Sequence, residues 1–291
     1  MRIALHGKST GPEAQSCISD VFELLKKHNI EAAISRSYQA DLKIKGLDSG
    51  HLSTFQLGDD LSSFDFIFSL GGDGTILDTI TYTSKAEVPI IGINLGRLGF
   101  LATTPRNEIE DIFDKLLADE LSIESRSLIH VDSNQGLFDP YNFGLNELTI
   151  VKKETSSMIV VHTYVDGDYL NSYWADGLIV ATPTGSTGYS LSCGGPLVHP
   201  STKNFIITPV SPHNLNVRPI IVSDKSVITF EIEGRSRQFM VSLDSRSQSV
   251  DDSVKISVRR EEFEAKLVRF NDHKYFDTLR NKLNWGLDAR N

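Results

Sequence analysis

The fold is decided by Phe64-Asp65-Phe66-Ile67-Phe68-Ser69-Leu70 followed by Gly71-Gly72-Asp73-Gly74-Thr75. The apolar run predicts a buried β-strand, and the residues from Thr75 to Ile80 can open a helix. Glycine permits positive φ and lets backbone N–H groups approach an anion closely, and a helix N-terminus attracts phosphate. The stretch therefore predicts a strand, a phosphate-binding turn and a helix in succession.

Asp73 is the unexpected member of this turn, because a carboxylate repels phosphate oxygens. In a phosphate-binding loop it would accept a proton from an attacking hydroxyl group or hold a metal ion. The alternative is that Asp73 is an ordinary turn residue between a strand and a helix. The five residues alone leave both interpretations open.

Two familiar phosphate motifs are excluded by their spacing. Gly7-Lys8-Ser9 resembles the end of a P-loop, but that motif requires glycine where this chain has Arg2. Gly72-Asp73-Gly74 does not complete a dinucleotide fingerprint, because Leu77 replaces the third glycine. The sequence therefore contains neither a Walker site nor a standard Rossmann site.

Composition narrows the class of protein. The chain has 291 residues, enough for two domains, and its 40% hydrophobic and 23% charged residues are typical of a globular protein. A net charge of -9 argues against nucleic acid or an anionic membrane as the main partner. Ile3-Ala4-Leu5 is too short for a signal peptide, and no run approaches the length of a membrane span. These features predict a cytoplasmic protein.

The sequence predicts no metal-binding residues. Cys17 and Cys193 have no Cys or His partner at ligand spacing, and the eight histidines are scattered. A magnesium ion that arrives with a nucleotide would leave little trace in the sequence.

The first hundred residues alternate between strand and helix patterns, which predicts an α/β domain with a doubly wound parallel sheet. Ligands bind beyond the carboxyl ends of the strands in such sheets, so the turns Gly71–Thr75 and Gly96–Phe100 should face one cleft. The predicted elements are strands at Arg2–Gly7, Phe64–Leu70 and Val88–Leu95 and helices at Pro12–His28, after Asp73, and near Pro105–Leu117.

The rest of the chain is rich in Val, Ile, Thr and aromatic residues and predicts an all-β domain. Asp166-Gly167 is a hairpin signal, and the Tyr275–Trp285 helix should return to the first domain. We therefore expect an α/β nucleotide-binding domain at 1–103 and 271–291, and a dinucleotide-binding and oligomerisation domain at 104–270. Gly46–Asp60 is expected to be a mobile loop. The predicted strands are Ile123–Val131, Phe143–Val151, Met158–Val165, Tyr169–Trp174, Gly177–Ala181, Ser226–Glu233, Phe239–Leu243 and Val254–Val258.

A second group of polar residues lies in the β-rich part. Thr182–Pro196 holds so many hydroxyls and glycines that it does not resemble a packed core, and it suits a nucleoside held by stacking and short hydrogen bonds. The alternative is a loop that joins two elements. Asn146-Glu147 could hold a ribose diol or could be a surface turn.

Taken together, these motifs closely resemble the NAD kinase family over nearly the whole chain. Phe205–Pro219 also matches the family's Pro-x-x-Pro-His-x-Leu-x-x-Arg-Pro pattern. The motifs that carry the resemblance occur in family order and are Gly71–Thr75, Gly96–Phe100, Asn146-Glu147, Asp176-Gly177, Thr182–Ser192 and Gly194-Gly195-Pro196.

The resemblance implies an enzyme that phosphorylates the 2′-hydroxyl of the adenosine ribose of NAD with a nucleoside triphosphate, giving NADP. Asp73 would accept the hydroxyl proton, and Asp176 would reach the nicotinamide end from a neighbouring subunit. The remaining roles would be phosphate binding by Gly71, Gly72, Gly74 and Thr75, ribose binding by Asn146 and Glu147, adenine contacts by Thr187, Gly188, Tyr189 and Ser192, and the lining of the dinucleotide cleft by Phe100.

The resemblance also implies Mg²⁺ with ATP, and a homo-oligomer, dimer or tetramer, with a shared active site. Trp174 stands where many members have a basic residue, and Arg97 where many have His. Two alternatives are a diacylglycerol-type lipid kinase, which shares the Gly-Gly-Asp-Gly turn, and a non-catalytic NAD(P) sensor on the same scaffold. The lipid kinase would not explain Thr182–Ser192, and a sensor would not need Asp73.

Overall fold

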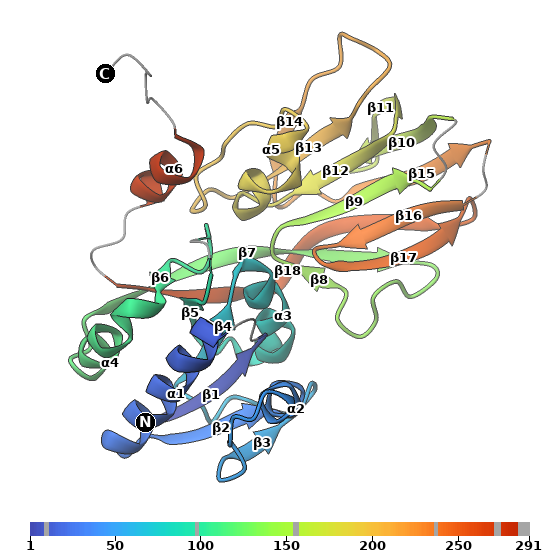
Figure 1. Cartoon of the computed structure of the whole chain (residues 1–291). Helices are drawn as coiled ribbons and strands as arrows, with labels where there is room; N and C mark the ends of the chain where they lie inside the picture. Colours follow the sequence, from blue (N-terminus) through green and yellow to red (C-terminus); the bar gives the residue numbers. More distant parts are fainter. Residues whose placement is uncertain (9–11, 97–98, 154–156, 236–237, 271–274, 285–291) are drawn as a thin grey trace. The chain divides into compact units, whose positions relative to one another are not determined.

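The computed structural model describes residues 1–8, 12–96, 99–153, 157–235, 238–270 and 275–284 (Figure 1). The chain divides into two compact units, one made of Met1–Ser125 with Ala265–Asn291 and the other of Arg126–Glu264. Two long strands, β7 (Leu121–Ser133) and β18 (Lys255–Phe270), connect the units. The departure at Arg97 and the predicted end of the last helix at Trp285 lie outside the described residues.

The first unit is built on a sheet with the strand order β18-β5-β4-β1-β2-β3. Every pair in this order is parallel, including the end of β18, where Leu267 pairs with Ile90. The chain end therefore returns to the first unit, as predicted. The strands are β1 (Arg2–Gly7), β2 (Glu31–Ser35), β3 (Ser53–Phe55), β4 (Phe66–Gly71), β5 (Ile90–Asn94) and β6 (Thr104–Pro105), which pairs with β5.

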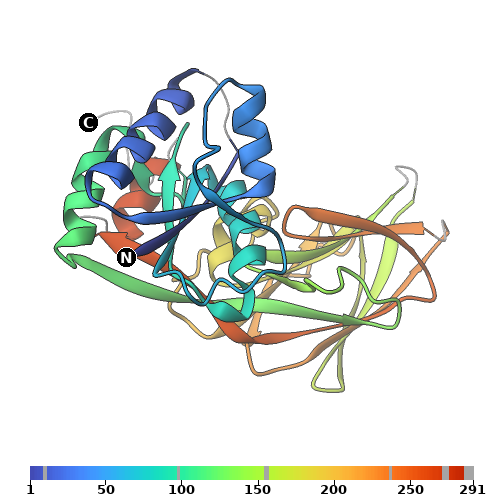
Figure 2. The same ribbon diagram turned by 90° about the horizontal axis from the view of Figure 1, so that it is seen from below.

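Helices cover both faces of this sheet (Figure 2). Phe68 and Leu70 of β4 lie in a core that α1, α2 and α4 share, whereas Ser69 between them accepts a hydrogen bond from Thr79 of α3 at 2.9 Å. Successive side chains of a strand point to opposite faces, so α3 covers the other face, and the predicted doubly wound sheet is confirmed. The helices of this unit are α1 (Pro12–Lys27), α2 (Arg36–Ile44), α3 (Asp73–Thr83), α4 (Ile109–Leu117) and α6 (Tyr275–Leu283), with short 3₁₀ turns at Ser84–Ala86 and Arg106–Glu108.

Sequence patterning did not reveal β2, α2 or β3. Five residues of β2 are too few to show a clear period, and α2 begins directly at the end of this strand, capped by the Ser35 side chain, which accepts a hydrogen bond from the N–H of Tyr38. Gly46–Asp60 was expected to be a loop, but its residues Ser53–Phe55 form β3. Among the described residues, no helix is both long and apolar enough to cross a membrane.

The second unit consists of two antiparallel sheets, which confirms the predicted all-β part. One has the order β11-β10-β15-β18 with β7 and β8 beside it, and the other has the order β14-β13-β12-β9-β16-β17. Side chains from both sheets, among them Val161, Phe230, Val180 and Phe239, form one core. Its remaining strands are β8 (Phe143–Gly144), β9 (Glu147–Lys152), β10 (Ile159–Val165), β11 (Asp168–Ala175), β12 (Gly177–Ala181), β13 (Asn204–Val210), β14 (Ile220–Ser223), β15 (Ile228–Gly234), β16 (Gln238–Leu243) and β17 (Arg246–Asp251).

The predicted hairpin at Asp166-Gly167 is confirmed. These two residues join β10 and β11, which pair antiparallel, and both have positive φ, 53° and 87°. That geometry is the one that a two-residue hairpin turn requires. The pairing fixes which side of β11 each side chain takes, so that Tyr173 lies in the core while Trp174 is 57% exposed.

Candidate active site

In the first unit, the site is built at the end of β4. Gly71 ends the strand, Gly72 caps α3, and Asp73 is the first residue of the helix. The Asp73 carboxylate accepts hydrogen bonds from three consecutive backbone N–H groups in the segment after β5. The N–H of Phe100 donates to Oδ2 at 2.8 Å, and those of Leu101 and Ala102 donate to Oδ1 at 3.1 Å and 3.0 Å. The two turns that were expected to face one cleft are therefore joined by Asp73 itself.

Among the glycines near Asp73, two make room for neighbouring side chains and two lie open at the start of α3. Gly71, Gly72 and Gly74 do not have positive φ. A Cβ at Gly71 would lie 2.1 Å from the Thr75 hydroxyl, and a Cβ at Gly99 would lie 1.8 Å from Asp73 Oδ1, so both positions need glycine for space. Gly72 and Gly74 are exposed and have open space beside them. They lie at the N-terminus of α3, where the backbone N–H groups have no acceptor within the helix.

Asp73 is half-buried and retains capacity to act on a ligand. A carboxylate oxygen can accept about two hydrogen bonds, and among the described residues Oδ2 of Asp73 accepts one, from the N–H of Phe100. Its remaining lone pair can accept a proton from a hydroxyl group. Thr75 is buried, so its side chain shapes the turn and is not open to a ligand.

In the second unit, Asn146 and Glu147 lie where β9 begins, and a second carboxylate holds them in place. Asp244, in the turn between β16 and β17, accepts the N–H of Leu145 at 2.7 Å on Oδ2, and those of Asn146 at 2.8 Å and Glu147 at 3.1 Å on Oδ1. A Cβ at Gly144 would lie 2.9 Å from Asp244 Oδ2. This arrangement repeats that of Asp73: one carboxylate, three consecutive N–H groups, and a glycine that leaves room. We call each arrangement a carboxylate clasp.

Sequence reasoning missed Asp244 and the role of Gly144. Asp244-Ser245 reads as an ordinary hairpin turn, and Asp244 lies 97 residues from Glu147 in the sequence. Burial raises the pKa of Asp244, while the three N–H groups and the charge of Arg246 act in the opposite direction. Arg246 in turn donates hydrogen bonds to the carbonyls of Tyr141 and Phe143, which anchors the same turn.

Glu147 has an unusual environment for a carboxylate. Burial, and secondarily the charge of Asp244, raise its pKa to about 8. Its Oε2 atom is buried and has no hydrogen-bond partner among the described residues. A Cβ at Gly188 would lie 3.0 Å from this oxygen, so glycine at this position leaves more room around it than alanine would. Glu147 is therefore mainly neutral at neutral pH, with one O–H donor and acceptor oxygens.

The Thr182–Ser192 segment is bound to Asn146. The N–H of Thr182 donates to Asn146 O at 2.8 Å, and a Cβ at Gly185 would lie 2.2 Å from the same oxygen. The segment forms a 3₁₀ turn, Thr184–Thr187, and the short helix α5 (Tyr189–Ser192). The structure thus brings Asn146, Glu147 and Gly188 together.

The hydroxyls of this segment were expected to suit a nucleoside, but four of its seven hydroxyl-bearing residues are buried in the structure. Thr182, Thr184, Ser186 and Ser190 are buried. The Ser186 hydroxyl donates to Val198 O at 3.1 Å, and Ser190 is 2.9 Å from the Thr208 hydroxyl. Buried hydroxyls need such partners, so these residues build the segment. The predicted adenine contacts are more open: Thr187 and Gly188 are partly exposed, and Tyr189 and Ser192 are exposed.

Asp176 lies between β11 and β12, and its Oδ1 forms an ion pair with Lys152 Nζ at 2.6 Å. Lys152 and the exposed Trp174 both line a cavity of about 640 Å³. Tyr173, the neighbour of Trp174, belongs to the core and is not available to a partner. Trp174 is the aromatic residue of this pair that a partner can reach.

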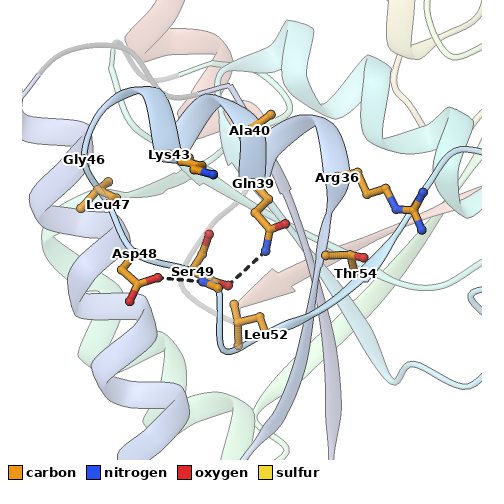
Figure 3. A pocket seen from close by; sticks show the side chains of 11 residues that line it. Arg36, Gln39, Ala40, Lys43, Gly46, Leu47, Asp48, Ser49, Leu52 and Thr54 are labelled. Atoms are coloured by element: carbon orange, nitrogen blue, oxygen red, sulfur yellow. Dashed lines mark hydrogen bonds between the residues drawn. The ribbon is translucent and has the colours of Figure 1, made fainter.

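A separate cavity of about 730 Å³ lies beside α2 in the first unit (Figure 3). Arg36, Gln39, Lys43 and Ser49 are among its lining residues, and Gln39 Nε2 donates to Ser49 O at 3.1 Å. None of the predicted site residues lines it.

The raised pKa of Glu147 predicts a pH dependence of stability. Between about pH 4.5 and about pH 8, the unfolded chain loses the Glu147 proton while the folded chain keeps it, so the free energy of unfolding should fall as pH rises, by up to about 1.4 kcal/mol per pH unit. Glu147→Gln cannot titrate and should lack this contribution. Urea denaturation of both proteins at several pH values in this window measures it.

Glu231→Gln is the matched control, because Glu231 is an exposed carboxylate of the same unit. Its free energy of unfolding should change with pH as that of the unsubstituted protein does. Identical slopes for all three proteins would mean that Glu147 is ionised in the folded state.

The comparisons with known proteins agree with this architecture. The ATP-NAD kinase N-terminal domain matches residues 9–121, and the ATP-NAD kinase C-terminal domain matches residues 145–270. The NAD kinase of Cytophaga hutchinsonii is 51% identical over 292 residues and that of Christiangramia forsetii 41% over 297 residues, in both cases covering 100% of each chain.

Solved structures show the same fold. An NAD kinase from Archaeoglobus fulgidus in complex with ATP matches this chain at a TM-score of 0.73 and 30% identity. The match covers 98% of this chain and 99% of that one. It also matches yeast NADH kinase complexed with NADH at a TM-score of 0.85 and 22% identity, covering 99% of this chain and 89% of that one. With both family domains and full-length relatives matched, the chain belongs to the ATP-NAD kinase family.

Proposed function

We propose that this chain transfers the terminal phosphoryl group of ATP to the 2′-hydroxyl of the adenosine ribose of NAD and so forms NADP. The observation that carries the proposal is the match to a curated NAD kinase over the whole chain at 51% identity. The comparisons lend no support to a lipid kinase or to a non-catalytic sensor.

Asp73 is the proposed proton acceptor. The 2′-oxygen forms a bond to the γ-phosphorus, the bond between this phosphorus and the bridging oxygen breaks, and ADP leaves with the electron pair. The hydroxyl proton passes to the open lone pair of Asp73 Oδ2 and then to solvent. The three N–H groups on the carboxylate support this role because they fix its orientation, and phosphoryl transfer depends mainly on positioning.

The exposed start of α3 is the proposed phosphate site. The backbone at Gly72 and Gly74 has open space for a phosphate group, and the helix N-terminus is electropositive. Gly71 and Thr75 are buried and act by shaping this turn.

Magnesium is proposed to enter with ATP, held mainly by phosphate oxygens and water. Among the described residues, no three His, Cys, Asp or Glu side chains are grouped to hold a metal ion. The Asp73 carboxylate already accepts three N–H groups, which occupy lone pairs that a metal ion would otherwise use. When bound, the ion offsets negative charge on the transferred phosphoryl group.

NAD is proposed to bind to the second unit, through Asn146, Glu147 and the segment around Tyr189. A neutral Glu147 can donate one hydrogen bond to a ribose hydroxyl and accept one from its neighbour. Tyr189 is 43% exposed and offers an aromatic face to adenine. Thr187, Gly188 and Ser192 lie on the same segment, and Phe100 is also proposed to contact the dinucleotide.

The enzyme is further proposed to be a homo-oligomer in which Asp176 reaches the nicotinamide end of a neighbouring subunit's substrate. The partly exposed Asp176 and the exposed Trp174 support this proposal, because exposed Trp is enriched at interfaces.

The function is tested by supplying the purified chain with Mg-ATP and NAD and detecting NADP with an NADP-specific dehydrogenase. NADH and diacylglycerol as acceptors, and polyphosphate as donor, complete the assay. NADP formation is expected. A folded, saturated sample that phosphorylates the lipid and yields no NADP would contradict the proposal.

Asp73→Asn should lower kcat on the order of 10²–10⁴-fold, the usual range for loss of a general base, with much smaller changes in the affinities for NAD and ATP. Steady-state kinetics and calorimetric titrations measure the two effects. The matched control is Asp244→Asn, which disturbs an equivalent clasp: it should lower stability and NAD affinity but retain most of kcat. Recovery of Asp73→Asn activity by excess Mg²⁺ or Mn²⁺ would instead assign Asp73 to metal binding.

Mixed oligomers test the shared site. Asp73→Asn and Asp176→Ala proteins, each nearly inactive, should regain activity when dissociated and reassembled together, since some sites then combine an intact Asp73 with an intact Asp176 of the other chain. Mass spectrometry confirms the mixing. Mixed oligomers no more active than the separate variants would place both residues in the same chain's site.

A further inference from the structure

Lys8 lies beside the proposed phosphate-binding turn. The sequence provides no reason to expect this, because Gly7-Lys8-Ser9 does not complete a P-loop motif. It follows β1 directly, and its N–H donates to Leu70 O of β4 at 3.1 Å. Gly7 and Leu70 are paired in the parallel register of these strands. A Cβ at Gly7 would lie 2.6 Å from Leu70 O, so glycine at this position permits the close approach. Lys8 therefore leaves the sheet next to Gly71 and Gly72.

The strand order places Lys8 at a position where ligands bind in sheets of this kind. From β1 the sheet continues through β2 and β3 on one side, and through β4 and β5 on the other. In open α/β sheets, ligands bind outside the carboxyl ends of the strands at the point where the order reverses. This point lies between β1 and β4, with Lys8 on one side and the start of α3 on the other.

The Lys8 ammonium forms an ion pair with Asp78 of α3, five residues after Asp73. The Lys8 side chain is 62% exposed, and ion pairs at such exposure contribute little to stability. A triphosphate carries several negative charges, so it can compete with one carboxylate for this ammonium group. Asp78 lies in the second turn of α3, so this ion pair keeps the Lys8 ammonium beside that helix without holding it firmly.

The neighbouring His6 does not supply positive charge here. Its ring is 4% exposed, and its Nδ1 lies 2.8 Å from the Ser35 hydroxyl. Burial lowers the pKa of His6 to about 4, so the ring is neutral at neutral pH. At the end of β1, the positive charge is that of Lys8.

We propose that Lys8 binds the phosphate chain of the nucleotide donor, with its ammonium group leaving Asp78 as the donor binds. The inference rests on the proposed function, because it names the cation that holds the donor of that reaction. It makes Lys8 and the helix N-terminus two sides of one anion site, one a mobile point charge and the other a fixed row of N–H groups.

The test is a calorimetric titration with the non-hydrolysable analogue β,γ-imido-ATP and Mg²⁺. Lys8→Met keeps an unbranched side chain that is one atom shorter and removes its charge, and it should weaken binding of the analogue roughly ten- to a hundredfold, the range for a lost hydrogen bond to a charged group. Lys8→Arg should restore most of the affinity. Affinity for NAD should be the same in all these proteins.

Lys43→Met is the matched control, since Lys43 is an exposed lysine of the same unit that lines the cavity beside α2 (Figure 3). It should bind the analogue as the unsubstituted protein does. In the unsubstituted protein, the analogue should also protect Lys8 but not Lys43 from acetylation by acetic anhydride, as read by mass spectrometry. This second measurement needs no substitution at Lys8.

Unchanged affinity of folded Lys8→Met for the analogue, or equal acetylation of Lys8 with and without it, would overturn the proposal. An equal loss of NAD affinity would also overturn it, because Lys8 would then act on the whole fold. The proposed function is judged separately, by NADP formation in the unsubstituted protein. If the unsubstituted protein makes NADP while Lys8→Met binds the analogue normally, the proposed function holds and the proposed role of Lys8 is wrong.

Discussion

The structure depends on two carboxylates that each hold three consecutive backbone N–H groups. Asp73 binds Phe100, Leu101 and Ala102, and Asp244 binds the residues from Leu145 to Glu147. Hydrogen bonds to a charged acceptor are about twice as strong as neutral ones, and buried backbone N–H groups are costly to leave unpaired. Each clasp therefore fixes a loop that regular secondary structure would not hold.

The two carboxylate clasps explain why glycine is needed at two positions next to them. Gly99 and Gly144 leave room for the carboxylates, and a methyl group at either position would collide with an aspartate oxygen. The second clasp also presents Asn146 to the segment that begins at Thr182, which is bound to its carbonyl oxygen. The side chains with proposed roles in catalysis and dinucleotide binding thus lie on or next to two loops whose geometry is set by the carboxylates of Asp73 and Asp244 and by the absence of side chains next to them.

Much of this could be predicted from the sequence, and the exceptions have physical causes. The strand before Gly71 and the helix after it were predicted because a strand buried on both faces gives a continuous apolar run. The β10–β11 hairpin was predicted from Asp166-Gly167, since few residues accept positive φ. In contrast, β2 is too short for a period, and Asp244 resembles any turn residue until its partners 97 to 99 positions away are known.

The sequence by itself determined the family, the fold class and the kinds of side chain at the candidate site, because these depend on local pattern and motif. Only the tertiary structure decided what surrounds each group. It showed Asp73 bound to the loop after β5, the Oε2 atom of Glu147 buried near a second carboxylate, and Lys8 paired with Asp78 beside the turn that follows β4. It also placed Tyr173 in the core and its neighbour Trp174 in solvent. Burial, pairing register and the distance between charges arise from residues far apart in the chain, and local patterns do not contain them.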